Sequence, residues 1–168
     1  MADDLLEENS TENTPMIVGL GVASKIAYQN LDEIQRNFRE IRDYFEERLD
    51  DHLGDSFVVN FQNSPRLPNT SSVSFPTLPF TSCDLLEKCK SFFASTGAAC
   101  HTGEVSKILL SCGLTECQAS KTVRFSFGRE TTREEVDRVV KELKAMVFFS
   151  KHGDSLMRAM GNGPVPGF

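Results

Sequence analysis

The chain has 168 residues, a net charge of −6, and a composition that is 39% hydrophobic and 25% charged. This length supports one domain with a hydrophobic core, and no apolar run approaches the roughly 18 residues that a membrane-spanning helix needs. Because the basic residues are dispersed rather than clustered, the sequence gives no basis for nucleic-acid binding.

Residues 1–10 are acidic and show no hydrophobic periodicity, so we expect a disordered leader. This leader has neither the basic and apolar pattern of a secretory signal nor the arginines of a mitochondrial transit peptide. We therefore expect a cytosolic protein.

A long amphipathic helix is predicted from Pro15 to about Leu53. Gly19 and Gly21 predict a break near its start, and Gly54 stands where the helix should end. Its apolar residues recur at steps of three or four: Leu31, Ile34, Phe38, Ile41, Phe45 and Leu49.

Two short strands are predicted next, at 56–61 and 71–75, because both segments are rich in valine and phenylalanine and are bounded by prolines. A helix is expected at about 81–90, where threonine and serine can cap its first turn. A further short strand is predicted at 92–95.

The second half of the chain predicts two short helices, at 105–111 and 115–120, followed by a strand at 122–127. The strand alternates, with Val123, Phe125 and Phe127 on one face and polar residues on the other.

The final helix begins with a capping box, in which Thr131 or Thr132 is followed three residues later by a glutamate. We expect the domain to end near residue 149, before a flexible tail at 150–168. The order of helices and strands is not a strict βαβ alternation, which predicts an α+β fold in two layers, with helices packed on a mixed sheet.

The chain has five cysteines, with no Cys-x-x-Cys pair, so we expect free thiols and no metal site: Cys83, Cys89, Cys100, Cys112 and Cys117. Cys100 lies in a run of small residues, 95–103, which predicts a loop and an accessible sulfur that suits a nucleophile. The alternative is a small buried hydrophobic residue. A protonated His101 beside it would lower the thiol pKa. The other four cysteines fall on predicted helices, where we expect packing roles.

Four stretches, in order, resemble the NifS-like class V aminotransferases, which include cysteine desulfurases and selenocysteine lyases. Residues 94–101 (Ala-Ser-Thr-Gly-Ala-Ala-Cys-His) resemble the catalytic-cysteine loop of that family. Residues 11–15 (Thr-Glu-Asn-Thr-Pro) resemble the end of its Arg-Pro-Gly-Thr-Glu-Asn segment, and 66–70 (Arg-Leu-Pro-Asn-Thr) its Leu-Pro-Asn strand entry. Residues 123–129 (Val-Arg-Phe-Ser-Phe-Gly-Arg) resemble its strand with the substrate-binding arginine.

The resemblance implies that 11–149 is the C-terminal small domain of a fold type I enzyme that uses pyridoxal phosphate and is a homodimer when complete. The residues around Cys100 favour a selenocysteine lyase, which converts L-selenocysteine to L-alanine and releases selenium. A selenium acceptor protein is then an expected partner. The alternative within the family is a cysteine desulfurase that supplies sulfur.

The resemblance also implies roles for individual residues. Arg124 would bind the substrate carboxylate through two parallel hydrogen bonds, with a solvent-facing ion pair as the structural alternative. Cys100 would either accept the selenium or protonate it as it leaves. Thr11 would reach the cofactor phosphate of the opposite subunit, with a helix N-cap as the alternative.

The family's cofactor lysine belongs to a His-Lys motif that this sequence does not contain. We therefore expect the chain alone to be inactive, as a fragment of the full enzyme. A third hypothesis is a binding or regulatory module that pairs with a full-length subunit through the helix around Leu31 to Leu49.

Overall fold

The computed structural model describes residues 12–96 and 105–160. The chain divides into two units, one up to Ile34 and one from Gln35 onward. Within the described residues, no helix is long and apolar enough to span a bilayer.

Helix α1 (Thr14–Leu53) is one continuous α-helix. The predicted break at Gly19 and Gly21 is therefore wrong. A glycine inside a helix costs only about 1 kcal/mol relative to alanine, and a long helix can absorb that cost twice. The helix ends where the sequence predicts, because Gly54 adopts a positive φ of 50°, a conformation that glycine enters without steric penalty.

The part of α1 in the first unit exposes its large apolar side chains. The exposed set comprises Met16, Ile17, Val18, Leu20, Val22, Ile26, Tyr28 and Leu31. Lys25 carries the one charge between residues 14 and 31. A helix that is apolar over this much of its surface normally packs against another surface.

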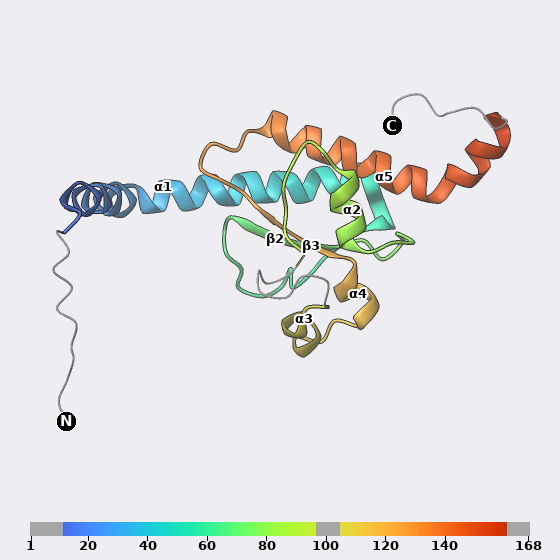
Figure 1. Ribbon diagram of the computed structural model, residues 1–168, viewed down its shortest axis with the longest axis horizontal. Coiled ribbons are helices and arrows are strands. Elements are labelled where there is room, and N and C mark those ends of the chain that lie inside the picture. The colour runs from blue at the N-terminus through green and yellow to red at the C-terminus, as the bar shows by residue number, and fades with distance from the viewer. Residues whose placement is uncertain (1–11, 97–104, 161–168) are drawn as a thin grey trace. The chain divides into compact units, whose positions relative to one another are not determined.

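The second unit contains the sheet and the shorter helices (Figure 1). After α1 and a 3₁₀ turn at Gly54–Ser56, its elements are β1 (Val58–Val59), β2 (Thr70–Ser74), α2 (Ser82–Lys88), α3 (Lys107–Ser111), α4 (Glu116–Ser120), β3 (Thr122–Ser126) and α5 (Arg133–Met160). These elements confirm the predicted order except for the strand at 92–95. β1 is shorter than expected, and α5 continues to Met160, so the flexible tail predicted from residue 150 is wrong for residues 150–160. Segment 92–95 forms only an isolated bridge through Ser95.

The three strands lie in the order β1-β2-β3, and both ladders are antiparallel. The α+β class is confirmed, but among the described strands the sheet is antiparallel rather than mixed. In the β2–β3 ladder, Ser72 lies opposite Arg124.

Side-chain caps explain where the helices begin. Thr81 forms a capping box with Asp84 at the start of α2. At the start of α5, the Thr132 N–H donates to Glu135 Oε2 at 3.0 Å, and the Glu135 N–H donates to Thr132 Oγ1 at 3.3 Å. This second pair confirms the predicted capping box of the final helix.

The hydrophobic core lies on one face of the sheet, beneath α5 and the C-terminal part of α1 (Figure 1). Phe45 of α1 is 1% exposed, and its ring centroid lies 4.7 Å from that of Phe125 and 5.4 Å from that of Phe127. Other buried residues of this core are Leu49, Val73, Phe75, Leu85, Val123, Val136, Val140, Leu143 and Val147.

Asp137 joins α5 to α1 at the edge of this core. Its carboxylate accepts hydrogen bonds from the Tyr44 hydroxyl at 3.0 Å and from Arg48 Nε at 2.8 Å. The hydrogen bond from Arg48 is the main reason that the pKa of Asp137 is lowered, so the contact is present at neutral pH.

Phe45→Ala is expected to lower the free energy of unfolding by about 3–5 kcal/mol, because it removes a fully buried ring and leaves a cavity. Phe93→Ala is the matched control: its side chain is fully exposed, so the expected change is within about 0.5 kcal/mol. Urea denaturation followed by circular dichroism measures both. Equal effects of the two substitutions would contradict the central position of Phe45.

Candidate functional site

Arg124 lies on the face of β3 that is turned away from the hydrophobic core. Val123 and Phe125, on either side of it, are 0% and 4% exposed, whereas Arg124 is exposed. Successive residues of a strand point to opposite faces of the sheet, so burial of its two neighbours directs Arg124 outward. The predicted alternation is confirmed.

The backbone of Arg124 is hydrogen-bonded to Ser95 in both directions. The Arg124 N–H donates to the Ser95 carbonyl at 2.7 Å, and the Ser95 N–H donates to the Arg124 carbonyl at 3.1 Å. This bridge places segment 95–96, which precedes Cys100 in the sequence by only a few residues, beside the arginine.

A cavity of about 240 Å³ opens around Arg124. Six of its lining residues carry a hydroxyl group, although most of the surface exposed in the cavity is apolar: Thr70, Ser72, Ser95, Thr96, Ser106 and Thr122. Phe61, Ile108 and Leu109 add an apolar wall. Phe61 is the non-glycine residue with positive φ, 59°, in the described chain, a conformation that costs a side-chain-bearing residue free energy and often occurs at functional sites.

A buried network of polar side chains fixes two residues of the cavity lining, Ser72 and Thr122. The Asn60 amide donates to Ser72 Oγ at 3.2 Å and accepts from Ser74 Oγ at 2.9 Å. Ser74 Oγ lies 2.8 Å from Thr122 Oγ1, which donates to the Gln118 carbonyl at 2.8 Å. A satisfied network of this kind holds its members in one arrangement, so Ser72 has a fixed position opposite Arg124.

The chemistry of the cavity suits a small anion. Its described lining contains one cation, Arg124, no carboxylate and no lysine. A guanidinium binds a carboxylate through two parallel hydrogen bonds, and hydroxyl groups can donate further ones.

Other predicted site residues lie outside the described part of the chain. This is the case for Cys100, His101 and Thr11. Of the predicted site residues, the structure therefore places Arg124. It also places Ser95 and Thr96, the last described residues before Cys100.

The remaining cysteines correct one expectation. Cys89 is buried, and burial raises the pKa of its thiol to about 12. Cys83, Cys112 and Cys117 are exposed, so they are not packing residues. Among the described residues, no group of three or more side chains is placed to hold a metal ion.

The sequence did not indicate Asn60, Phe61 or Ser72 as parts of the site. Asn60 and Phe61 looked like the end of a predicted strand, and Ser72 like one serine of a strand. Their contribution depends on the β2–β3 register and on the conformation of the turn after β1, neither of which follows from local sequence.

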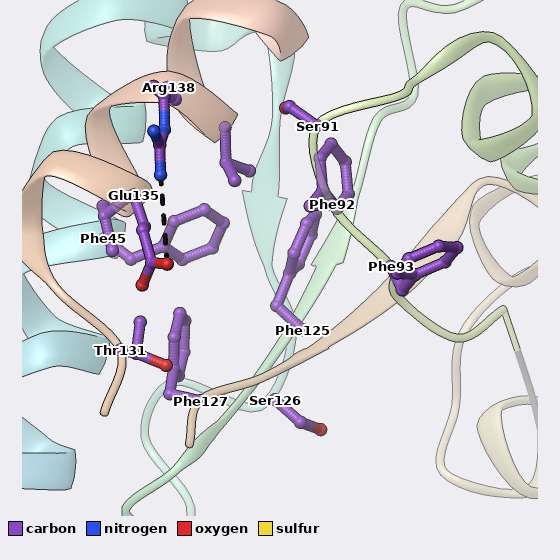
Figure 2. A pocket seen from close by; sticks show the side chains of 12 residues that line it. Phe45, Ser91, Phe92, Phe93, Phe125, Ser126, Phe127, Thr131, Glu135 and Arg138 are labelled. Atoms are coloured by element: carbon purple, nitrogen blue, oxygen red, sulfur yellow. Dashed lines mark ion pairs between the residues drawn. The ribbon is translucent and has the colours of Figure 1, made fainter. Parts of the chain in front are cut away.

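A second cavity, of about 210 Å³, lies on the core side of β3 (Figure 2). Phe45, Phe92, Phe125 and Phe127 line it, and Glu135 and Arg138 form an ion pair at 3.9 Å at its rim. Its walls are largely core side chains, and it lacks an unpaired charge suited to an anionic substrate.

Comparisons with known proteins show the family and the fold of this chain. The family model for aminotransferase class V matches residues 4–139. The selenocysteine lyase of Rattus norvegicus is 42% identical over 82% of this chain and 33% of its own length. A cysteine desulfurase of Gluconacetobacter diazotrophicus is 36% identical over 82% of this chain and 34% of its own.

Solved structures show the same relationship. A NifS-like protein superposes with a TM-score of 0.66 at 26% identity, over 83% of this chain and 35% of that protein. A NifS-like protein from Rickettsia africae, at 21% identity, also gives a TM-score of 0.66 and supports the fold. The chain spans about a third of the length of the relatives it matches. The family model, which covers most of the sequence, shows that this chain belongs to the class V aminotransferases.

Proposed function

We propose that this chain supplies the substrate-binding arginine and the catalytic cysteine of a selenocysteine lyase. The observation that carries the proposal is the placement of Arg124 at a cavity whose lining includes several residues with hydroxyl groups, bridged through its backbone to Ser95. Cys100 follows Ser95 by five positions in the sequence, so the bridge brings a residue close to Cys100 in sequence to the arginine. Selenocysteine lyases at about 40% identity support the choice of substrate.

In this proposal Arg124 orients the amino-acid substrate by its carboxylate. A lysine cannot replace it, because an ammonium group does not offer two parallel donors in one plane. Ser72 and Thr122, held by the buried network, limit the movement of the bound carboxylate. Cys100 then either accepts the selenium or donates the proton that the departing selenium takes up, and His101 lowers the pKa of its thiol.

The described residues do not by themselves fit pyridoxal phosphate, the cofactor that the family uses. Binding through an imine requires a lysine, and none lines the cavity around Arg124. The pyridine nitrogen requires a carboxylate, which that lining also lacks. We therefore assign the cofactor site to the part of the relatives that this chain does not cover. Thr11 is proposed as a phosphate contact across a homodimer.

A cysteine desulfurase is the alternative within the family. Desulfurases among the relatives are 34–36% identical to the chain, compared with 42% for a selenocysteine lyase. The two activities share the need for an arginine and a cysteine, so competition between cysteine and selenocysteine as substrates distinguishes them.

The exposed apolar part of α1 supports a second function, as a binding module. The predicted partner surface around Leu31 to Leu49 is wrong in its C-terminal part, because Phe45 and Leu49 are buried in the chain's own core. The surface that stays exposed is Met16–Leu31. We propose that it pairs with the part of a class V subunit that this chain lacks.

The chain alone, mixed with pyridoxal phosphate, is expected to show no absorption band of lysine-bound cofactor and to release no alanine from selenocysteine or cysteine. The reason is that the family's His-Lys motif, which contains the cofactor-binding lysine, does not occur in this sequence. Absorption spectroscopy and an alanine assay measure this, with Cys100→Ala as the control. Cys100-dependent alanine release by the chain alone would show that another lysine here serves the cofactor.

The role of Arg124 is tested by mixing the chain with a fragment of a selenocysteine lyase that lacks the matching third. Arg124→Lys is expected to raise the KM for selenocysteine about 10- to 100-fold, because a charged hydrogen bond of about 1.5–3 kcal/mol is lost. Arg129→Lys, an exposed position on the same segment, is the matched control. A normal KM for the Arg124 variant in an active mixture would contradict the proposed carboxylate contact.

Leu20→Lys is expected to weaken binding of the same fragment at least about tenfold, because it places a charge in an apolar interface. Gln29→Lys is the control, since nine residues along a helix place it on the opposite side from Leu20. Isothermal titration calorimetry measures both. Undiminished binding by the Leu20 variant would exclude Met16–Leu31 as the interface.

A further inference from the structure

Segment 89–96 connects the end of α2 to the residues that precede Cys100. α2 ends at Lys88, and Cys89 adopts an extended conformation with ψ of 136°. From there the chain crosses toward β3, where Ser95 bridges to Arg124. The path of this segment therefore decides the position of Ser95 and Thr96, the last described residues before Cys100.

Glu142 of α5 holds the start of this segment. One carboxylate oxygen accepts the Lys90 N–H at 2.8 Å, and the other accepts the Ser91 N–H at 3.2 Å. The Ser91 hydroxyl donates to the same carboxylate. Three donors from two adjacent residues converge on one side chain of a helix that belongs to the core.

The charged form of Glu142 is the form that this arrangement stabilises. Burial acts to raise the pKa of Glu142, but hydrogen bonds from the Ser91 side chain and from the Lys90 and Ser91 backbones outweigh it, so the pKa is lowered. Charge-assisted hydrogen bonds are roughly twice as strong as neutral ones.

Of the strand predicted at 92–95, only Ser95 pairs with β3. The ring centroid of Phe92 lies 5.7 Å from that of Phe125, whereas the Phe93 side chain is fully exposed (Figure 2). The segment is hydrogen-bonded to α5 at Ser91 and pairs with β3 at Ser95. It is thus fixed at both ends, with one aromatic contact between them.

We propose that Glu142 is a positioning residue for segment 89–96: by binding Lys90 and Ser91 it fixes the register in which Ser95 meets Arg124. The proposal rests on the proposed function only for the catalytic role of Cys100, which follows this segment in the sequence. Without the carboxylate, the two backbone N–H groups lose their partners, and the start of the segment is free to move about the Ser95 bridge.

The test uses amide hydrogen exchange of this chain, measured by NMR. Glu142→Ala is expected to accelerate exchange of the Ser95 and Arg124 amides at least about tenfold, because their bridge opens locally. The Phe127 amide, which donates to the Asn69 carbonyl at 2.9 Å on the other side of β3, is expected to keep its rate. Glu134→Ala, an exposed carboxylate of the same helix, is expected to change neither.

Two further variants separate positioning from general stability. Glu142→Gln keeps one acceptor oxygen and is expected to restore part of the protection at Ser95. Ser91→Ala removes only the hydroxyl contact, so it is expected to give a smaller acceleration in a chain that folds normally. Acceleration of all three amides together, or no acceleration at Ser95 in either the Glu142 or Ser91 variants, would overturn the proposal.

In the mixture with the lyase fragment, Glu142→Ala is expected to lower kcat with little change in KM, the reverse of Arg124→Lys. An unchanged kcat in an active mixture would overturn the positioning role. If the mixture is inactive with the unmodified chain, the proposed function fails, while the exchange result still decides what Glu142 does to the segment.

Discussion

The alternation of side chains along β3 is the constraint on which both the core and the candidate site depend. Val123 and Phe125 bury their side chains beneath the helices, and this burial turns Arg124 to the opposite face. A shift of one residue in the β2–β3 register would place a guanidinium in the core and a phenylalanine in the cavity. Such a shift is strongly disfavoured, so the core fixes the position of the arginine.

In the proposed function, the chain provides substrate-binding groups but not the cofactor site. The cavity around Arg124 offers one cation and several hydroxyl groups, which suit a carboxylate, but no lysine for pyridoxal phosphate. The chain spans about a third of its relatives' length, and we propose that the cofactor-binding groups belong to the remainder of such proteins. We propose that this remainder binds the exposed apolar stretch Met16–Leu31.

Local signals in the sequence correctly located most of the helices and strands. Capping residues such as Thr81 and Thr132 act on amides within one turn, so their effect can be read without the tertiary structure. The predicted break at Gly19 and Gly21 failed, because glycine lowers helix stability without forbidding the helix. The strand predicted at 92–95 forms only the bridge at Ser95, and the residues just before it, Lys90 and Ser91, are bound by Glu142, which is 52 and 51 positions away.

The sequence by itself determined the family, the α+β class and the outward direction of Arg124, because motif order and period-two alternation are properties of adjacent residues. The tertiary structure alone decided which residues surround that arginine. Phe61 and Ser72 reach the cavity through a turn with positive φ and through strand pairing, Asn60 binds Ser72 from the same turn, and Glu142 binds the start of segment 89–96 from another helix. These contacts join residues distant in sequence, and only the packing of the whole domain brings them together.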